Sequence, residues 1–354
     1  MKIKAVICGA TFGALYIEAI KLISNIELLG IFSTGSENSK NLAKREHIKL
    51  FTSIEEIPPN VDIAFVAIKS SILGGKGTEI AKLLLNKKIN VIQEHPVITS
   101  EIIECQRIAK KEEVYYKIGN LYEQLDSINA FIKTASFLNR LEKVEHISVL
   151  TSSQGMYSLM KILNESLNNF RELKILNKVA NYRYPFTNIE GKINSTTLNI
   201  QVHNEVNDKY SNNYMHILHR IIFFYENGRL ELNDTFGSVV WRSRMNILNG
   251  HNNFDPEKNI DMCYVVHEEK EIDYERLLAC KFPEAIAKDI CYFMDFETNG
   301  MSVVDIQKEC LVSNKWSEIT RVCGFPRNID KQLECVDRIK DLKNEKRISN
   351  EKIK

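Results

Sequence analysis

Short apolar runs alternate with amphipathic stretches through the N-terminal third of the chain. Brief apolar runs bounded by turn residues indicate strands, and apolar positions three or four apart indicate helices. The pattern predicts strands at Lys4–Gly9, Ile26–Ser33, Ile48–Phe51, Val61–Ile68, Asn90–Gln93 and Val114–Lys117, with helices at Phe12–Asn25, Ser36–Glu46, Gly77–Lys87 and Thr99–Glu112. This alternation predicts an α/β fold with a doubly wound parallel sheet of the Rossmann type over residues 1–121.

Longer elements follow Tyr122, and strands then dominate. Asn227-Gly228 lies between two apolar runs and is a strong hairpin signal, because a type I′ turn requires positive φ at both central positions. We expect helices at 125–141, 156–168, 274–294 and 303–322 and strands at 173–180, 196–203, 219–225, 229–233 and 239–245. They predict an α+β domain over residues 122–335 with a mainly antiparallel sheet, whose last helices can return to the first domain. The charged residues of 336–354 favour a solvated, fraying helical tail.

The composition is that of an ordinary globular protein. The chain has 354 residues, enough for two domains, and a formal net charge of +1, which gives no sign of a nucleic-acid partner. It contains no apolar stretch long enough to cross a membrane. The N-terminus runs directly into a predicted strand and leaves no room for a signal peptide. We therefore expect a cytoplasmic protein without a membrane partner.

The cysteines and histidines do not form a recognisable metal signature. No two of the eight cysteines have CxxC spacing, and His216 and His219 are the closest pair of histidines. Most cysteines lie in apolar helix or strand patterns, so we expect reduced, buried thiols and no metal site. The cysteines are Cys8, Cys105, Cys263, Cys280, Cys291, Cys310, Cys323 and Cys335.

The turn after the first predicted strand has the features of a dinucleotide site. Gly9 can form the tight turn, and Gly13 can allow close approach of backbone or helix. Thr11 stands where a GxGxxG motif has its middle glycine, so the motif alone is a weak match. Its place between a strand and a helix is what such a site requires. We predict that Gly9, Thr11, Phe12 and Gly13 bind a dinucleotide; the alternative is a glycine turn in another α/β fold.

The end of the second predicted strand favours NADPH over NADH. An NAD site usually has a carboxylate here, whereas this chain has Ser33, Thr34 and Ser36, followed by Lys40. Hydroxyl groups and a cation suit a 2′-phosphate, which a carboxylate would repel. Glu37 is the awkward neighbour, and we expect it to face solvent.

A glycine-rich loop follows the buried strand Val61–Ile68. Residues 69–78 contain three glycines and two serines ahead of a helix, a flexible turn that suits an anion. We assign Ser70 to the cofactor and Gly74 and Gly75 to the substrate. The alternative is a plain connection between a strand and a helix.

The candidate catalytic residues are His95 and Tyr122. His95 follows the strand Asn90–Gln93 and precedes Pro96, at an edge that opens onto the ligand crevice of such sheets. Its ordinary pKa near neutrality suits a proton donor. The Tyr122 hydroxyl, between the two predicted domains, could donate to a developing anion. The alternatives are a structural histidine at a strand end and a tyrosine of the core or interface.

A second group of basic and aromatic residues lies on strands of the predicted second domain. Alternation along a strand sends His219 and Arg220 to opposite faces, so they cannot both face one ligand. We interpret the group as structural or facing a dimer partner. Its members are His216, His219, Arg220, Trp241, Arg242 and Arg244.

The segment Glu94-His95-Pro96 resembles the Glu-Lys-Pro segment of the Gfo/Idh/MocA oxidoreductases. Residues 74–79 and 93–97 resemble those of a narrower branch, the thiazolinyl imine reductases of siderophore assembly lines. The resemblance extends over most of the chain. Further similar stretches are Cys8-Gly9 to Phe12-Gly13, Gly35-Ser36, Leu218-His219-Arg220, Asp234-Thr235 to Gly237, Val240-Trp241, Phe282 to Ala287 and Trp316.

The resemblance implies an NADPH-dependent reduction of a thiazoline C=N to a thiazolidine. It implies a substrate carried as a thioester on a nonribosomal peptide synthetase, His95 and Tyr122 as proton-donor candidates, and a homodimer built on the second domain's sheet. Glu94 is assigned to the cofactor site and could also orient His95. Histidine suits this chemistry, because an unperturbed lysine would release its proton reluctantly near neutral pH. Asn38 and Lys40 depart from the arginine-bearing segment expected in relatives.

Two other functions compete with this hypothesis. One is a Gfo/Idh/MocA dehydrogenase of a free sugar or cyclitol. The presence of His95 in place of the family's lysine argues against it. The other is a non-catalytic NADPH sensor or assembly-line scaffold. The sequence does not identify the pathway, the stereochemistry, the carrier-docking surface or which of His95 and Tyr122 gives up the proton.

Overall fold

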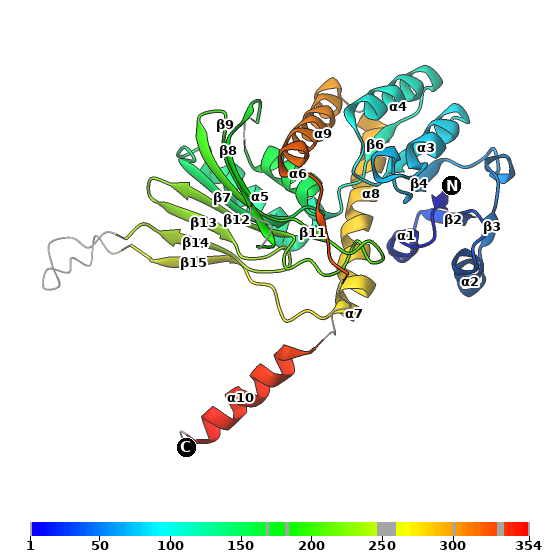
Figure 1. Ribbon diagram of the computed structural model, residues 1–354. Helices are drawn as coiled ribbons and strands as arrows, with labels where there is room; N and C mark the ends of the chain where they lie inside the picture. The colour runs from blue at the N-terminus through cyan, green and yellow to red at the C-terminus, as the bar shows by residue number, and fades with distance from the viewer. Residues whose placement is uncertain are drawn as a thin grey trace, which may run out of the picture.

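The computed structural model describes residues 2–167, 170–180, 184–245, 260–299, 302–330 and 336–352. They form a parallel sheet with its helices, and a larger mixed sheet with helices on one face (Figure 1). The predicted α/β fold, with a Rossmann-type parallel sheet and a second, mainly antiparallel sheet, is confirmed. The predicted boundary at Tyr122 falls in a 3-10 turn, η3 (Tyr122–Gln124), between the two sheets.

The parallel sheet has six strands in the order β3-β2-β1-β4-β5-β6. This order reverses direction between β1 and β4, and ligands of such sheets bind beyond the carboxyl ends of the strands at that point. The strands are β1 (Ile3–Cys8), β2 (Ile26–Phe32), β3 (Lys49–Phe51), β4 (Ile63–Val66), β5 (Asn90–Gln93) and β6 (Tyr116–Ile118), and the helices are α1 (Gly13–Lys21), α2 (Glu37–Arg45), α3 (Gly77–Asn86) and α4 (Thr99–Glu112).

The mixed sheet has eight strands in the order β15-β14-β13-β12-β7-β10-β9-β8. The β7–β10 pair is parallel and the other pairs are antiparallel. The strands are β7 (His146–Ser152), β8 (Leu173–Ala180), β9 (Phe186–Ile193), β10 (Thr196–His203), β12 (His219–Tyr225), β13 (Gly228–Leu232), β14 (Val239–Ser243) and β15 (Cys263–His267). A separate parallel pair joins β11 (Glu205–Val206) to β16 (Arg327–Asn328).

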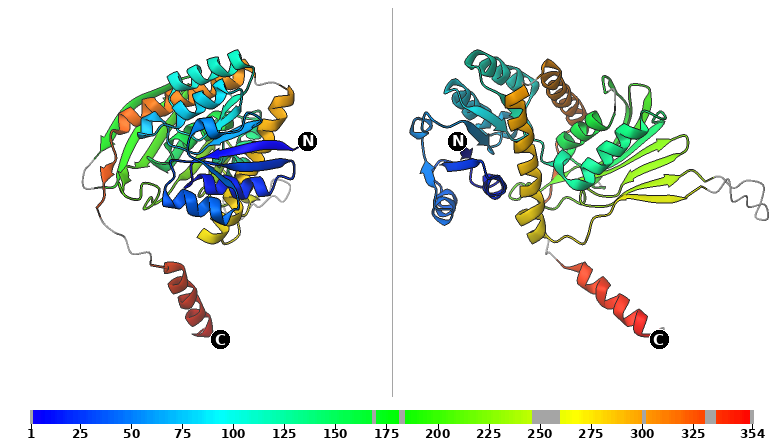
Figure 2. Two further views of the ribbon diagram at one scale, coloured as in Figure 1. Left: turned by 90° about the vertical axis from the view of Figure 1, so that its right-hand side faces the viewer. Right: turned by 180° about the vertical axis from the view of Figure 1, so that it is seen from behind.

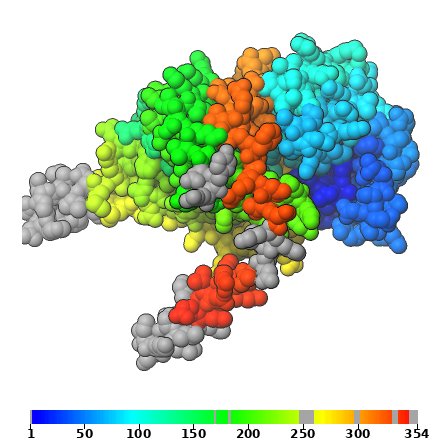
Figure 3. Space-filling model, in the orientation of Figure 1, coloured from blue at the N-terminus to red at the C-terminus, as the bar shows by residue number. Residues whose placement is uncertain are grey.

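Helices cover one face of the mixed sheet and join it to the parallel sheet. On the mixed sheet, α5 (Asp126–Leu138) and α6 (Met156–Ser166) pack on one face (Figure 2). The last long helices return to the parallel sheet, as expected: α8 (Phe282–Asn299) contacts α1, and α9 (Val303–Cys323) contacts both α4 and α6. In Figure 3, α9 lies between the two parts of the molecule. The helices therefore hold the two sheets together at the carboxyl edge of β5.

Several predicted elements differ from the observed ones. The strands β7, β9 and β15 were absent from the prediction, because β7 and β9 mix apolar with polar residues and β15 is a short strand at the exposed edge of the sheet. A π-turn at Leu277–Lys281 interrupts the helix expected over 274–294, between α7 (Tyr274–Arg276) and α8. The predicted helix end at Asn168 lies outside the described residues. The tail forms an exposed helix, α10 (Arg338–Lys352), that points away from both sheets (Figure 1).

The described cysteines are all free, but not all are buried. Cys8, Cys105 and Cys323 are buried, whereas the expectation of burial is wrong for Cys263, Cys280 and Cys291, which are exposed. They lie in an edge strand or on the outer sides of helices, where an apolar pattern does not imply a covered side chain. Cys335 lies outside the described residues. Nor does any described helix have the length and apolar character needed to cross a membrane.

Candidate active site

The predicted site residues come from five connections at the carboxyl edge of the parallel sheet. These connections follow β1, β2, β4, β5 and β6, and the strand order reverses between β1 and β4. The edge faces the second part of the molecule, because η3 follows β6 directly. The structure thus brings the candidates to one side of the sheet.

The turn after β1 is shaped for close approach to the backbone. Gly9 has a φ of +104°, and a Cβ there would lie 2.7 Å from the Ala67 carbonyl oxygen. A Cβ on Gly13 would lie 2.8 Å from the Ile7 Cγ2, so α1 packs directly on β1. Phe12 occupies the N-cap position of α1 and provides no side-chain cap. Thr11 is exposed. No side chain therefore caps the N-terminus of α1, where an anion can bind.

The residues predicted to bind a 2′-phosphate lie together at the end of β2. Ser33 is partly buried and Thr34 is exposed, and the Ser36 hydroxyl caps α2 by accepting a hydrogen bond from the Ser39 N–H at 3.3 Å. The Lys40 Nζ lies 2.8 Å from the Glu37 Oε1, and both side chains are largely exposed. Glu37 faces solvent, as expected, but it also forms an ion pair with the Lys40 ammonium group. Lys40 has to leave this exposed pair to contact a phosphate, at little cost.

The loop after β4 is tied to the loop after β5. The buried Ser70 donates a hydrogen bond to the Pro96 carbonyl oxygen, so its hydroxyl supports the backbone beside His95. Gly74 is exposed in the left-handed region at φ +74°. A Cβ on Gly75 would lie 2.0 Å from the Lys69 carbonyl oxygen, which explains why only glycine fits there. The assignments of these residues to cofactor and substrate stay predictions.

His95 lies in a row of five aromatic rings that joins both parts of the molecule. Its ring stacks on Tyr157 of α6, with centroids 5.1 Å apart and planes at 10°. Tyr122 lies on another side at 6.0 Å, and His219 of β12 meets Tyr122 edge-on at 5.3 Å. Trp316 of α9 contacts Tyr157 at 5.5 Å. The two candidate catalytic residues are therefore brought together. Tyr157 packs against the His95 ring, and His219 packs against the Tyr122 ring.

The surroundings of His95 keep its imidazole neutral. Burial lowers the pKa of His95 to about 4, and the positive charge of Lys161 acts in the same direction. The Gly119 backbone carbonyl accepts a hydrogen bond from the ring, which partly opposes this change. The His95 Nδ1 lies 3.8 Å from the Glu94 Oε2. At neutral pH His95 is a neutral ring beside a carboxyl group.

Glu94 and Tyr122 both hold protons more tightly than usual. Burial raises the pKa of Glu94 to about 7, although a hydrogen bond donated by the Tyr16 hydroxyl lowers it. Burial and the nearby Glu94 raise the pKa of Tyr122 to about 12. Tyr122 is thus a neutral phenol at physiological pH. Together with His95, these groups form a site that can hold and release one proton near pH 7.

Sequence reasoning missed part of this site. His219, interpreted as structural or dimer-facing, is buried beside Tyr122, while Arg220 is exposed on the opposite face, as alternation predicts. The His219 ring lies 2.9 Å from the Ser158 Oγ and 3.0 Å from the Gly155 carbonyl oxygen. Tyr16 and Tyr157 carried no sequence signal for the site, because each reaches it from a helix far away in the chain.

The other members of that group lie outside the site. His216 contacts His203, with ring centroids 4.9 Å apart. Trp241 lies beside Tyr225 at 5.8 Å. Arg242 approaches Glu231, with Nε 3.6 Å from Oε1, and the Arg244 Nη1 donates to the Glu226 carbonyl oxygen at 3.0 Å. These contacts agree with a structural role on the mixed sheet.

Buried ion pairs lie behind the aromatic row. Lys161, one turn after Tyr157 on α6, pairs with Glu309 of α9 at 2.8 Å. Lys117 of β6 pairs with Asp289 of α8, which also accepts the Asn120 N–H at 3.0 Å.

Among the described residues, the buried Tyr157 hydroxyl has no hydrogen-bond partner and is available to a ligand or a water. No cluster of three metal-binding side chains is found within the described ranges.

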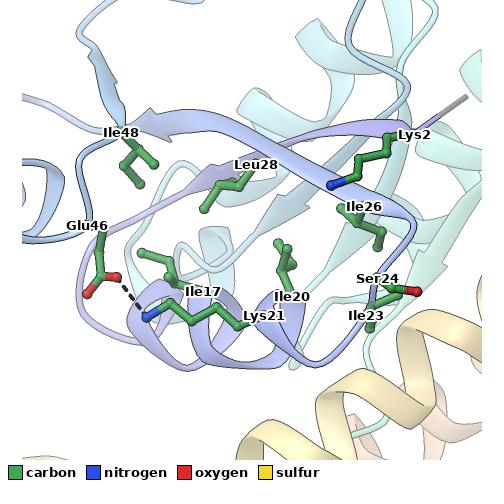
Figure 4. Close-up of a pocket in the computed structure, with 10 residues that line it drawn as sticks. All are labelled: Lys2, Ile17, Ile20, Lys21, Ile23, Ser24, Ile26, Leu28, Glu46 and Ile48. Carbon is green, nitrogen blue, oxygen red and sulfur yellow. Dashed lines mark ion pairs between the residues drawn. The ribbon is translucent and has the colours of Figure 1, made fainter.

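A cavity of about 320 Å³ lies away from this site, between α1 and the start of β2 (Figure 4). Ile17, Ile20 and Ile26 provide much of its apolar wall, and the ion pair between Lys21 and Glu46 crosses its rim at 2.8 Å. None of the predicted site residues lines it. Its polar lining groups are Lys2, Lys21, Ser24 and Glu46, of which Lys21 and Glu46 pair with each other, so we place the chemistry at the β5 end instead.

Comparisons with known proteins define the class to which this fold and site belong. Residues 3–120 match the model of the oxidoreductase family with an NAD-binding Rossmann fold, GFO_IDH_MocA. Residues 142–242 match the model described as thiazolinyl imine reductase Irp3-like, C-terminal. These matches define an oxidoreductase with a Rossmann nucleotide-binding domain. The chain belongs to the Gfo/Idh/MocA oxidoreductase family, in the branch with an Irp3-like thiazolinyl imine reductase C-terminal domain.

Solved structures share the fold at low sequence identity. An oxidoreductase from Agrobacterium radiobacter, in complex with NAD+, L-tartaric acid and magnesium, is 10% identical with a TM-score of 0.66, covering 90% of this chain and 95% of its own. UDP-N-acetylglucosamine 3-dehydrogenase from Acidithiobacillus ferrooxidans is 13% identical with a TM-score of 0.63, covering 90% and 97%. Biliverdin reductase from Synechocystis, in complex with biliverdin and NADP+, is 9% identical with a TM-score of 0.63, covering 90% and 97%. No curated protein sequence matches the chain.

Proposed function

We propose that the protein uses NADPH to reduce a thiazoline C=N to a thiazolidine, on an intermediate that a nonribosomal peptide synthetase carries as a thioester. The observation that carries the proposal is the position of His95. It occupies the place of the lysine in the Glu-Lys-Pro segment of the family, packed between Tyr157 and Tyr122. The match of residues 142–242 to the Irp3-like domain supports the same substrate class.

The turn after β1 fits a dinucleotide. The positive φ of Gly9 and the close packing at Gly13 leave the backbone open to a pyrophosphate, and the N-terminus of α1 is uncapped. Ser33, Thr34, Ser36 and Lys40 would hold the 2′-phosphate of NADPH. When bound, the cofactor supplies the hydride that the imine carbon receives.

The residues of the chain supply the proton that the imine nitrogen needs. Tyr122 carries a proton at neutral pH and lies beside His95, which is neutral and can accept or relay a proton. We therefore assign proton donation to the Tyr122 hydroxyl and proton relay to His95. Glu94, whose pKa is about 7, is the neighbouring group that can replace the proton. One proton and one hydride are consumed for each C=N reduced.

The proposal includes a cytoplasmic homodimer, with partners that are neither nucleic acids nor membranes. The dimer would form across the mixed sheet. The face opposite α5 and α6 carries partly buried apolar side chains, among them Leu150, Ile222 and Phe224. A carrier domain has to approach from the side on which the loops after β1, β4 and β5 open.

A dehydrogenase of a free sugar or cyclitol is the second candidate. A protein named UDP-N-acetylglucosamine 3-dehydrogenase shares the fold. Alcohol oxidation needs a base that keeps the proton it accepts, and a histidine with a pKa of about 4 holds a proton weakly, whereas a relay only has to pass the proton on. A non-catalytic sensor would bind NADPH without needing the row of rings around His95. The geometry therefore favours imine reduction.

Two measurements test the proposal. The first titrates the protein with NADPH and NADH; tighter binding of NADPH, lost in Lys40→Glu, is expected, and a preference for NADH would contradict the assignment of the β2 end. The second offers a carrier-bound thiazoline and follows the absorbance of the reduced cofactor. Turnover that requires Tyr122 supports the proposal. Turnover of a polyol with NAD+, and none with any thiazoline, would favour the dehydrogenase.

A further inference from the structure

Tyr16 reaches the candidate active site from the helix that follows the cofactor turn. It lies on α1, in the turn of helix after Gly13, and is 2% exposed. Its ring stacks on Phe65 of β4, with centroids 5.3 Å apart and planes at 28°. Its hydroxyl donates a hydrogen bond to the Glu94 Oε1. The tyrosine thus joins the cofactor-binding helix to the carboxyl group beside His95.

The hydrogen bond leaves one oxygen of Glu94 for His95. Tyr16 occupies Oε1, and Oε2 lies 3.8 Å from the His95 Nδ1. Both carboxyl oxygens are therefore accounted for, one by an element of the cofactor site and one by the catalytic candidate. Without the tyrosine hydroxyl, the buried carboxyl group would be free to rotate away from His95.

Gly119 makes room for this arrangement. A Cβ at this position would lie 3.1 Å from the Glu94 Oε1 and 3.2 Å from the Tyr16 hydroxyl oxygen. The Gly119 carbonyl also accepts the hydrogen bond from His95. One backbone segment after β6 therefore packs against all three side chains. A methyl group there would press on the hydrogen bond itself.

Other charged groups face the pair from every element packed around it. Lys161 of α6 and Asp289 of α8 act on both Glu94 and His95, His219 of β12 acts on His95, and the Glu94 charge acts on Tyr122 of η3. Tyr16 is the group that donates a side-chain hydrogen bond to Glu94. Its loss is thus the smallest change that alters Glu94 and leaves this charge distribution in place.

We propose that Tyr16 is a positioning residue of this site, whose hydroxyl holds the Glu94 carboxyl group with its free oxygen toward His95. Its effect on turnover rests on the proposed function, but its effect on Glu94 does not. Because α1 begins in the cofactor turn, the same contact links the position of the cofactor helix to the protonation of the catalytic pair. In this role Tyr16 acts through Glu94 and does not contact the substrate atoms that receive the hydride and the proton.

The test is Tyr16→Phe, with Tyr225→Phe as the matched control. Tyr225 is also buried and donates its hydroxyl to a side chain, the Asn139 Oδ1 at 3.1 Å, but lies on β12 at the far end from His219. Infrared difference spectra across pH report the carbonyl band of the protonated Glu94, assigned by its loss in Glu94→Gln. Removing a hydrogen bond to the carboxylate raises the midpoint pH of the Glu94 titration. We expect a rise of about one pH unit in Tyr16→Phe. The control leaves it unchanged.

Kinetics with a carrier-bound thiazoline supply the second readout. In Tyr16→Phe we expect kcat to fall about tenfold with little change in the KM for NADPH, and its pH profile to move with the Glu94 midpoint. An unchanged midpoint and profile would overturn the positioning role. If Tyr16→Phe does not fold, Gly119→Ala crowds the same bond and has to move the same midpoint. Absence of thiazoline turnover in the wild type would refute the proposed function alone, because the infrared midpoint still decides the role of Tyr16.

Discussion

Tyr122 shows how burial selects a chemical role at the scale of a single residue. Its phenol sits between His95 and His219, and its pKa is raised to about 12, so it keeps its proton at any physiological pH. His95 is driven the other way, to a neutral ring. Burial therefore raises the pKa of Tyr122 and lowers the pKa of His95. The phenol keeps its proton, and the imidazole is neutral and can relay one.

The first prediction concerns Tyr122 itself. In Tyr122→Phe, turnover of a carrier-bound thiazoline should fall about a hundredfold, because the nitrogen loses its proton donor while the ring packing is retained. NADPH affinity, measured by fluorescence titration, should stay the same. Tyr115→Phe, near the amino end of β6, is the control and should leave turnover intact. Full activity in Tyr122→Phe would transfer the donor role to His95.

The second prediction concerns the pH dependence of stability at Glu94. Its pKa in the folded protein is raised from 4.5 to about 7, so the folded state binds the proton more tightly than the unfolded state. The stability associated with Glu94 is therefore greatest below pH 4.5 and falls as pH rises through 7. Glu94→Gln removes this loss, and its free energy of unfolding relative to wild type should rise by up to about 3 kcal/mol between pH 4.5 and pH 8.

Urea unfolding of both proteins at several pH values measures this difference. The comparison with wild type is necessary because His95 and His219, whose pKa values are lowered to about 4, act in the opposite direction between pH 4 and 6.5. Both proteins retain these histidines, so their effects cancel in the difference. A difference that does not change with pH would mean that the pKa of Glu94 is the same in the folded and unfolded states.

The elements were predictable to the extent that one face or both faces of each are apolar. β4 is buried at all four positions and its pattern was plain in the sequence. β7 alternates buried with half-buried residues and follows a polar turn, so it presents no apolar run, whereas β15 has a short apolar run but lies at the exposed edge of the sheet. What the sequence could not provide was the pairing of β7 with β10 and β12, which depends on contacts between distant segments.

The third prediction concerns the junction of β6 and α8. Lys117 and Asp289 are each 5% exposed and pair with each other, and Asp289 also accepts the Asn120 N–H. Asp289→Asn leaves the Lys117 charge buried without its counter-ion, which should lower the free energy of unfolding by about 3–5 kcal/mol. Asp341→Asn breaks the exposed pair with Arg338 on α10 and should cost less than about 0.5 kcal/mol. Equal effects of the two substitutions in urea unfolding would contradict a buried clamp at this junction.

At the scale of the whole molecule, the site exists because the chain returns to its first sheet. His95 and Tyr122 could be proposed from sequence because each stands at the end of an element at the carboxyl edge of the predicted parallel sheet. Tyr157, Trp316 and His219 complete the row only after α6, α9 and β12 pack around η3. No periodicity or spacing in the sequence predicts the contacts among these rings. The turn after β1 was read from local glycine positions, whereas the pairing of Tyr16 with Glu94 depends on the order of the strands.

The last prediction concerns the uncovered face of the mixed sheet. An antiparallel sheet can expose one face to water when that face is polar. Here α5 and α6 cover one face (Figure 2), and no helix among the described residues packs on the other. The central strand β12 nevertheless presents Ile222 and Phe224 there, each half-buried. An apolar surface of this kind on a sheet is typical of an interface, and in the proposed homodimer a second copy of the chain would cover it.

Ile222→Glu should therefore convert the dimer to a monomer. A charge at the centre of a two-fold interface meets its own copy across the axis, so the penalty falls on both protomers. Light scattering after size-exclusion chromatography measures the mass, and circular dichroism shows whether the monomer keeps its fold. Lys192→Glu, on the same outer face but near the sheet edge at β9, is the control and should leave the dimer intact. A wild-type protein that remains monomeric at every concentration would refute the interface, and dimers of both variants would place it elsewhere on the surface.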